Sequence, residues 1–185
     1  MHTLKLTMVA LAAMLGASPV EAQQLPEYLL HPGDEIEVSV WKEVDLQRKV
    51  IIRPDGKFSF PLTGEIIAVG RTAATVKSEI EEKLKAYIPE PVVTVSVTGI
   101  AGNQIYVIGQ VIKPGAYVMN PQINILQALS LAGGMTPFAA TNDIIVIRSS
   151  KGSQRVLQFQ YGDVSKGRSL EKNVMLESGD VVVVP

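Results

Sequence analysis

The stretch IYVIGQVIKPGAYVMNP, residues 105–121, alternates like a β-strand, breaks at Lys113-Pro114-Gly115, and then resumes its alternation. Proline presets φ for a turn and glycine is free to take positive φ, so Pro114 and Gly115 predict the turn of a β-hairpin. Gly109 lies inside the first strand, where the missing side chain permits a bulge or the close approach of another backbone. A loop that grips a ligand is the competing interpretation of the same glycines.

Working outward from this hairpin, the chain alternates predicted strands with two predicted helices. A helix is expected to start at Thr72 and stop at Pro89, about sixteen residues and roughly 24 Å long. A shorter helix follows the N-cap Asn124 and is expected to end at Gly133 and Gly134. Asp55 and Gly56 form a strong turn signal between two short strands in 49–62. The other predicted strands cover 35–41, 91–99, 143–148, 155–161 and 178–185.

Two halves of the chain share this order of elements. The segment 58–80, with Gly64 between its strands, parallels the segment 105–129. The turns Gly33-Asp34 and Gly179-Asp180 each feed a strand. This repetition predicts an α+β protein with two small mixed modules, each one helix against a small sheet. We place the modules at 23–99 and 100–185, with a final strand, 180–185, that could pack back on the first module.

The first 22 residues read as a secretory signal peptide. Lys5 precedes the apolar run LTMVALAAMLGA, and small residues lead to a cleavage site between Ala22 and Gln23. The chain has no cysteine, so we expect neither a disulfide framework nor a lipidated N-terminus. The formal net charge of −1 argues against nucleic acid as a partner.

Residues that could carry chemistry are few. His31 is the one histidine after the signal peptide, and it lies in a turn, where catalysis with Asp34 would also need an activated serine. The segment 54–56 resembles the start of a calcium loop but lacks the ligands that should follow. The glycines at 109 and 115 flank a lysine without a helix behind them, so we expect no phosphate cradle there.

The remaining candidate residues are also better explained by structural roles than by catalysis or ligand binding. The segment 70–72 precedes a helix start, where an anion could bind. Three glutamates, at positions 79, 81 and 82, follow one helix and do not face each other across a cleft, as glycoside hydrolysis requires. Trp41 could stack on a sugar ring, but we expect it to cover core. We therefore predict no enzyme, no metal and no cofactor.

Six segments, taken in order, resemble the outer-membrane-associated polysaccharide export proteins, in which an export domain precedes an SLBB (soluble-ligand-binding β-grasp) domain. The resemblance runs from Tyr28 to Pro185 and is greatest to the short forms found with exosortase-linked exopolysaccharide systems. The segments are LHPGDEIEVSVWKEVDLQ, IRPDGKFSFPLTGEI, GRTAATVKSEIEEKLKAYIPEPVVTVSV, YVIGQVIKPGAYVMN, ILQALSLAGGMTPFA and LESGDVVVVP.

The resemblance implies a non-enzymatic periplasmic component of an exopolysaccharide export machine. Family members form rings around the polymer path and often touch an inner-membrane chain-length or tyrosine-kinase protein. Larger members carry a lipidated cysteine and a C-terminal membrane-crossing helix. This chain has no cysteine and ends with a predicted strand. We therefore expect a periplasmic homo-oligomer or adaptor, peripheral to the outer membrane, that needs a separate outer-membrane protein.

Two other functions stay open from the sequence. A monomeric β-grasp module could bind a small ligand or an oligosaccharide, although its ten aromatic residues are dispersed along the chain. A glycan hydrolase or lyase would require a pair of catalytic residues that the sequence does not supply. The glycines and aspartates named above are therefore candidates for structural turns or for assembly.

Overall fold

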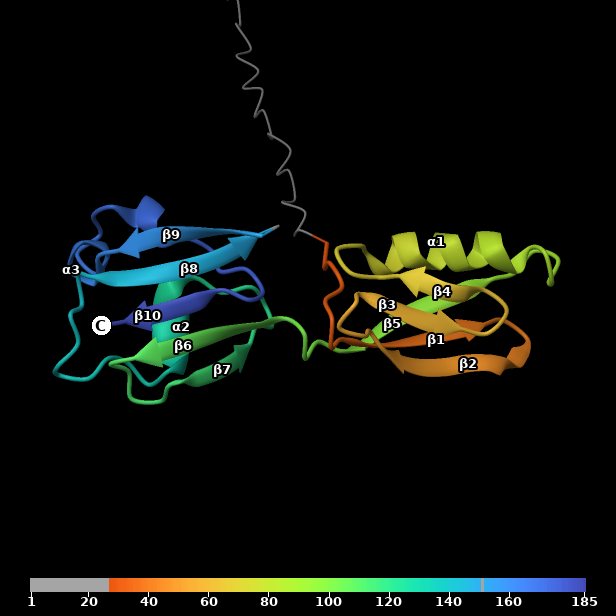
Figure 1. The fold of residues 1–185 in the computed structure, drawn as a ribbon, viewed down its shortest axis with the longest axis horizontal. Coiled ribbons are helices and arrows are strands. Elements are labelled where there is room, and N and C mark those ends of the chain that lie inside the picture. The colour runs from red at the N-terminus through yellow and green to blue at the C-terminus, as the bar shows by residue number, and fades with distance from the viewer. Residues whose placement is uncertain (1–26, 151) are drawn as a thin grey trace, which may run out of the picture.

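The computed structural model describes residues 27–150 and 152–185, which form two α+β modules arranged end to end (Figure 1). Residues up to Gly99 build the first module, and residues from Gln104 build the second. The predicted fold class is therefore confirmed: each module sets one main helix against a small sheet. Ala22 and Gln23, the expected cleavage site, lie outside the described residues.

The first module has a three-stranded antiparallel sheet with β1 (Glu35–Val40) between β2 (Glu43–Ile51) and β5 (Val93–Gly99). Strict alternation in β1 explains its two faces, because Ile36, Val38 and Val40 all point into the core. Val40 pairs with Glu43, so β1 and β2 are joined by a two-residue turn.

A second hairpin and a helix complete this module. The hairpin pairs β3 (Lys57–Phe60) with β4 (Gly64–Ile67), and the helix is α1 (Ala73–Leu84). The buried core of the module includes Phe58, Phe60, Ile66 and the helix residues Val76, Ile80 and Leu84.

Helix α1 begins where the sequence predicts and ends earlier. The Thr72 hydroxyl accepts a hydrogen bond from the Thr75 amide at 3.2 Å, which is an N-cap contact. The expected end at Pro89 is wrong, because the last helical residue is Leu84. Proline cannot donate to the carbonyl four residues before it and disfavours helical backbone at Ile88, so the final turn unwinds upstream of it.

The second module is built on a five-stranded sheet in the order β7-β6-β10-β8-β9. The opening stretch of the sequence forms the antiparallel hairpin of β6 (Gln104–Gly109) and β7 (Gly115–Val118). A second hairpin pairs β8 (Ile144–Ser150) with β9 (Ser153–Phe159).

Strand β10 (Val181–Val184) lies in the middle of this sheet. It runs parallel to β6 and antiparallel to β8, so it joins the two hairpins. The expectation that the final strand could pack back on the first module is therefore wrong. Its apolar run explains the placement, since Val182 and Val184 are fully buried in the core of the second module.

Helix α2 (Ile125–Leu131) covers one face of the five-stranded sheet. Asn124 caps it in a capping box, because its side chain accepts from the Gln127 amide and the Gln127 side chain accepts from the Asn124 amide. Ile125, Ala128 and Leu129 pack into the core. A short helix α3 (Tyr161–Val164) and the 3-10 turn η1 (Leu170–Lys172) follow β9.

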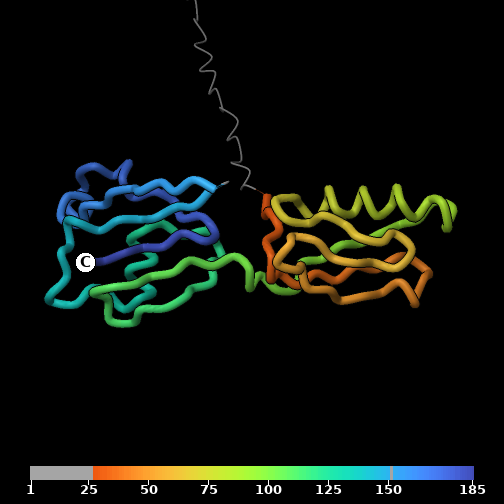
Figure 2. Tube along the Cα trace, viewed as in Figure 1, coloured from red at the N-terminus to blue at the C-terminus, as the bar shows by residue number. Residues whose placement is uncertain are grey.

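The chain passes from one module to the other through residues 100–103, and its C-terminal end lies at the far side of the second module (Figure 2). Within the described residues, no helix has both the length and the apolar character that crossing a membrane requires.

Candidate functional site: the junction and the distal groove

The junction between the modules is organised around the carboxylate of Asp34, which is fully buried. Its Oδ2 accepts from the Tyr28 hydroxyl at 2.7 Å and from the His31 amide at 2.8 Å. Its Oδ1 accepts from the amide of Gly102, in the linker, at 2.9 Å. A residue of the first module thus holds the linker by a charge-assisted hydrogen bond.

Gly102 is also held from the second module. Its carbonyl accepts from the Ser178 hydroxyl at 2.9 Å, and the next turn residue, Gly179, donates its amide to the Gln104 carbonyl at 2.8 Å. A Cβ at Gly102 would lie 2.3 Å from the Pro32 carbonyl oxygen and 2.9 Å from Asp34 Oδ1. Only glycine at this position therefore allows both modules to form hydrogen bonds with the linker at these distances.

The second Gly-Asp turn repeats the backbone pattern of the first. Asp180 Oδ2 accepts from the Glu177 amide at 2.9 Å, and the Asp180 amide donates to the Glu177 carbonyl at 3.0 Å. His31 and Asp34 make the same two contacts with each other, at 2.8 and 3.1 Å. The two turns that the sequence suggested as copies therefore share one hydrogen-bond pattern.

The buried Asp180 has a charged partner, Arg148. Arg148 Nε lies 2.9 Å from Asp180 Oδ1, and its Nη2 lies 2.6 Å from Oδ2. The same guanidinium donates to the Met175 carbonyl at 2.9 Å and to Glu177 at 2.5 Å. The hydrogen bond with Asp180 raises the pKa of Arg148, so the guanidinium stays charged at any physiological pH.

The cluster of Tyr28, His31 and Asp34 is not arranged for catalysis. Burial, together with the hydrogen bond to Asp34, raises the pKa of Tyr28 well above its ordinary value, so the phenol stays protonated. His31 Nδ1 lies 3.2 Å from the Tyr28 hydroxyl and 3.7 Å from Asp34 Oδ2. Because the carboxylate already accepts three hydrogen bonds, the cluster fixes the junction.

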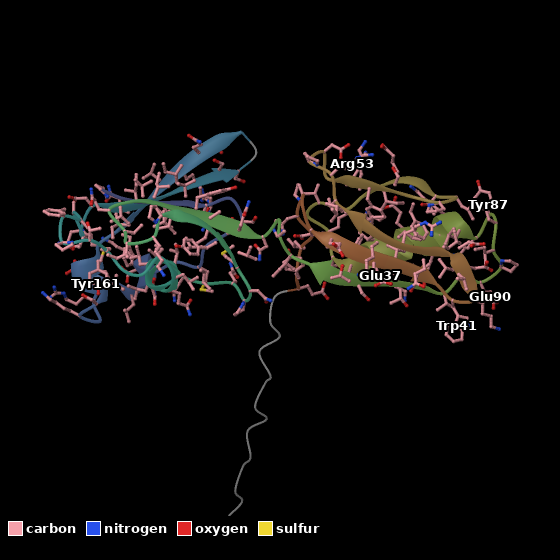
Figure 3. All side chains as sticks on the ribbon, turned by 90° about the horizontal axis from the view of Figure 1, so that it is seen from below. Glu37, Trp41, Arg53, Tyr87, Glu90 and Tyr161 are labelled. Atoms are coloured by element: carbon pink, nitrogen blue, oxygen red, sulfur yellow. The ribbon has the colours of Figure 1, made fainter. Side chains whose placement is uncertain are left out.

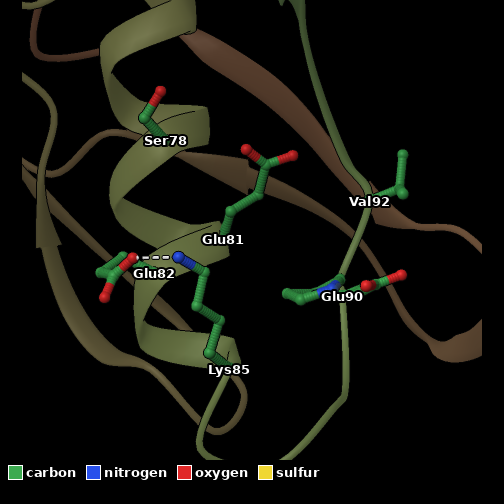
Figure 4. A pocket seen from close by; sticks show the side chains of 7 residues that line it. Ser78, Glu81, Glu82, Lys85, Glu90 and Val92 are labelled. Carbon is green, nitrogen blue, oxygen red and sulfur yellow. Dashed lines mark hydrogen bonds and ion pairs between the residues drawn. The ribbon is translucent and has the colours of Figure 1, made fainter.

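At the other end of the first module lies an open groove of about 430 Å³ (Figure 4). In Figure 4, Glu82 pairs with Lys85 at 2.5 Å, and Glu81 lies between α1 and the segment that leads into β5. Glu81 also accepts from the Val93 amide at 3.1 Å. The groove is lined by Ser78, Glu81, Glu82, Lys85, Glu90, Pro91 and Val92.

Trp41 lies next to the groove residue Val92 and is 72% exposed. The expectation that it covers core is wrong. Alternation in β1 sends Val40 inward, whereas Trp41 occupies the two-residue turn beyond the strand end. Its amide donates to the Val92 carbonyl at 2.9 Å, which ties the turn to the groove wall. Figure 3 shows Trp41 and Glu90 at this same end of the module.

Several predicted turn residues sit where close packing excludes a side chain. Gly109 has φ +94°, and a Cβ there would lie 2.0 Å from the Val184 carbonyl oxygen. Gly56 has φ +79°, and its Cβ would lie 2.3 Å from a Val69 methyl group. Gly133 has φ +79°, and a Cβ there would lie 3.2 Å from the Ile112 Cβ.

The other predicted turn residues have more room. Four glycines have positive φ and lie in turns. The Asp55 carboxylate accepts a hydrogen bond from Arg53, which lowers the pKa of that carboxyl. The expectation of a positive φ at Gly115 is wrong, because this residue begins β7 in extended backbone after Pro114. The four glycines are Gly33, Gly64, Gly134 and Gly179.

Sequence reasoning missed four residues that build the junction and its counterpart. Arg148 offered a signal, since it is a charged residue that directly follows the apolar run of a strand. Tyr28, Gly102 and Ser178 offered none, because their roles depend on contacts between distant segments. Across 27–150 and 152–185, no group of three or more histidine, aspartate or glutamate side chains is placed to hold a metal ion.

Comparison with known proteins gives two family matches and several relatives. Residues 22–98 match the family described as polysaccharide biosynthesis/export protein, and residues 103–184 match the SLBB domain. The exopolysaccharide production protein ExoF of Rhizobium meliloti is 30% identical over 140 residues, which cover 70% of this chain and 33% of ExoF.

Two further relatives carry export or transport in their names. The EPS I polysaccharide export outer membrane protein EpsA of Ralstonia solanacearum is 30% identical over 72% of this chain and 35% of its own length. The polysialic acid transport protein KpsD of Escherichia coli is 27% identical over 74% of this chain and 25% of its own length. The match thus spans about a third or less of each relative.

Proposed function

Because the chain belongs to the polysaccharide biosynthesis/export proteins and carries an SLBB domain behind its export domain, we propose that it is a non-enzymatic component of an exopolysaccharide export machine. The observation that carries this proposal is the presence of both domains, in the family order, on one two-module frame. The structural use of Asp34, whose carboxylate accepts from the His31 amide in the turn, supports a role other than catalysis.

The junction supports a scaffold role. Asp34 of the first module and Ser178 of the second both form hydrogen bonds with Gly102. The orientation of one module relative to the other therefore stays fixed while a polymer passes. We place the protein in the periplasm, peripheral to the outer membrane, as a homo-oligomer or adaptor. Its partners would be an inner-membrane chain-length or tyrosine-kinase protein and a separate outer-membrane protein.

We assign contact with the polysaccharide to the distal groove and Trp41. An exposed indole offers a flat apolar surface for the C–H face of a sugar ring. The carboxylates of Glu82 and Glu90 in the adjacent groove are acceptors for sugar hydroxyl groups. These two features occur together at one end of the first module (Figure 3).

Deleting the gene tests the export role. We expect exopolysaccharide to accumulate in the periplasm instead of reaching the medium, because synthesis continues while translocation stops. Complementation with the intact gene should restore secretion. Unchanged secretion in the deletion strain would overturn the proposed function.

The polymer contact is testable by fluorescence, because Trp41 is the single tryptophan of the chain. Titration of purified residues 23–185 with fragments of the host polysaccharide should change the emission of Trp41 saturably. Phe138→Ala is the matched control, since Phe138 is an aromatic residue of the second module that is 86% exposed. It should leave the titration unchanged, and an emission that does not respond to fragments contradicts the assignment.

The same titration separates export from the alternative of a monomeric binding module. Saturable binding of fragments by a monomeric protein, together with unchanged secretion in the deletion strain, would favour the binding module. Loss of secretion on deletion favours export whatever the fragment affinity.

A further inference from the structure

The face of the five-stranded sheet opposite α2 is apolar, and no helix among residues 27–150 and 152–185 covers it. Antiparallel sheets with one solvated face normally carry polar residues there. Here the outward positions are mainly aliphatic, and Tyr106, Ile108, Val118 and Val156 are between 39% and 58% exposed. We define the outer sheet face as Tyr106, Ile108, Ala116, Val118, Ile145, Ile147, Val156, Val181 and Val183.

Strand register makes this face continuous. Tyr106, Val181, Ile147 and Val156 are successive partners across β6, β10, β8 and β9. Ile108, Val183 and Ile145 form a second row beside the first, in the same strand order. Figure 1 shows the five strands side by side with α2 behind them. With Ala116 of β7 beside Tyr106, the first row crosses the sheet from edge to edge, and the second row covers its three central strands.

The face also carries no formal charge. Its remaining outward residues on these five strands are Gln104, Ser149, Gln154 and Gln158, as the strand pairing shows. The charged residue of β8, Arg148, points inward to Asp180. A charged partner would find no counter-charge here, whereas an identical neutral face meets no repulsion.

The three-stranded sheet of the first module provides an internal comparison. Its outward positions include Glu35, Glu37, Lys49 and Ser96, with Glu37 accepting from Gln47 at 2.7 Å. That face has the polar character expected of a solvated sheet. The same chain therefore has one sheet face suited to water and one that is not, and an apolar patch of this kind marks an interaction surface.

We propose that the outer sheet face is a self-association surface, at which two copies of the chain pack sheet on sheet. Two neutral, apolar sheets pack about 10 Å apart with interdigitating side chains. The five strands, spaced about 4.8 Å apart and about six residues long at roughly 3.3 Å per residue, cover about 480 Å². Two copies thus bury roughly 1,000 Å², which is the lower bound for a specific interface and fits a weak dimer.

This inference rests on the proposed homo-oligomer for its biological setting, but it concerns a different kind of contact. A face that packs on its own copy is isologous and closes after two subunits, whereas a ring needs a heterologous contact. The outer sheet face would therefore pair subunits, and any ring would use other surfaces.

The test is sedimentation of purified residues 23–185 over a concentration series up to about 500 µM, where a micromolar dimer is well populated. Ile147→Lys places a charge at the centre of the face and should weaken the dimer at least tenfold, since a buried unpaired charge opposes association. Ser96→Lys is the matched control, because it adds the same charge to the polar sheet of the first module. It should leave the dimer unchanged.

Cross-linking gives a second readout, because the chain has no cysteine of its own. Val181→Cys lies on the central strand, so a thiol cross-linker about 10 Å long should join two copies across the packed sheets. Ser96→Cys should not cross-link. If Ile147→Lys fails to fold, Val156→Lys at the sheet edge replaces it.

A wild-type monomer throughout the concentration series, without cross-linking at position 181, would overturn the inference. A dimer that is weakened by Ser96→Lys and not by Ile147→Lys would also overturn it. Because these measurements use purified protein and the secretion test uses the deletion strain, failure of the dimer and failure of the export role are distinguishable.

Discussion

The turns at Gly33-Asp34 and Gly179-Asp180 share a backbone pattern but use their buried carboxylates differently. Asp34 is surrounded by neutral donors, one of which belongs to the linker. Asp180 is paired with a guanidinium of its own module, Arg148. One local structure thus serves to join two modules in the first case and to hold a single sheet in the second.

This difference predicts unequal responses to mutation. Loss of the cation beside a buried carboxylate leaves an uncompensated charge, whereas loss of one neutral donor out of three leaves the carboxylate partly satisfied. The second turn should therefore be the more sensitive of the two to loss of one side chain. Mutations in the first turn should change the orientation of the two modules more than they change the stability of either module.

Arg148→Ala is expected to have the largest effect. It leaves Asp180 buried and unpaired, which should lower the free energy of unfolding of the second module by about 3–5 kcal/mol. Hydrogen exchange resolved by peptide should show faster exchange in β8 and β10 and little change in β1. The matched control is Arg53→Ala, which removes an exposed arginine and should have a much smaller effect. Equal effects of the two variants would contradict the assigned role of Arg148.

Gly102→Ala tests the junction directly. The added Cβ would lie 2.3 Å from the Pro32 carbonyl oxygen, so the linker must shift, at a cost of about 1–3 kcal/mol. Small-angle scattering should detect a wider range of distances between the modules. Gly115→Ala is the control, since Gly115 has open space around its Cβ and lacks a positive φ. A scattering profile that matches the wild type would argue against a fixed junction.

Tyr28→Phe removes one of the three donors to Asp34 and keeps the ring. A hydrogen bond to a charged group contributes about 1.5 kcal/mol at the lower end of its range, and we expect a loss of that order. Urea unfolding followed by circular dichroism measures it. A loss as large as that of Arg148→Ala would remove the contrast between the two turns.

Glu79→Gln should give the smallest effect and is distinguished by its pH dependence. The Arg71 guanidinium holds the pKa of the Glu79 carboxyl below its usual value. A lowered folded-state pKa contributes stability above the unfolded value near 4.5 and loses it as the pH falls through the folded value. The variant should therefore be less stable than the wild type by under about 1 kcal/mol at neutral pH, with the gap closing in acid.

A gap between the two proteins that does not change with pH would show that the Glu79 charge is not the source of the difference. The measurement is urea unfolding of both proteins between about pH 3 and pH 7, the range over which a carboxyl titrates.

Local signals account for most of the predicted fold. The alternation of Ile36, Val38 and Val40 indicates a strand with one buried face, and the N-caps Thr72 and Asn124 mark helix starts that the structure confirms. These signals act over a few residues, so the sequence alone contains them. The helix end at Leu84 was harder, because the effect of Pro89 extends upstream by several residues.

Contacts between distant segments account for what the sequence did not reveal. Nothing near Gly102 indicates that it lies between Asp34 and Ser178, which are 68 and 76 residues away. Trp41 was placed in the core by its size, yet the two-residue turn between β1 and β2 leaves it outside. The position of β10 between two hairpins likewise depends on pairings that no local pattern encodes.

The central position of β10 also fixes an order of events during synthesis. The first module has all its strands once Gly99 has been made, so it can fold while the rest of the chain is still being added. The second module holds only two separate hairpins until Val181 to Val184 arrive, because these residues bridge β6 and β8. Such distant pairings form slowly. The first module can therefore be complete while the second still lacks its central strand.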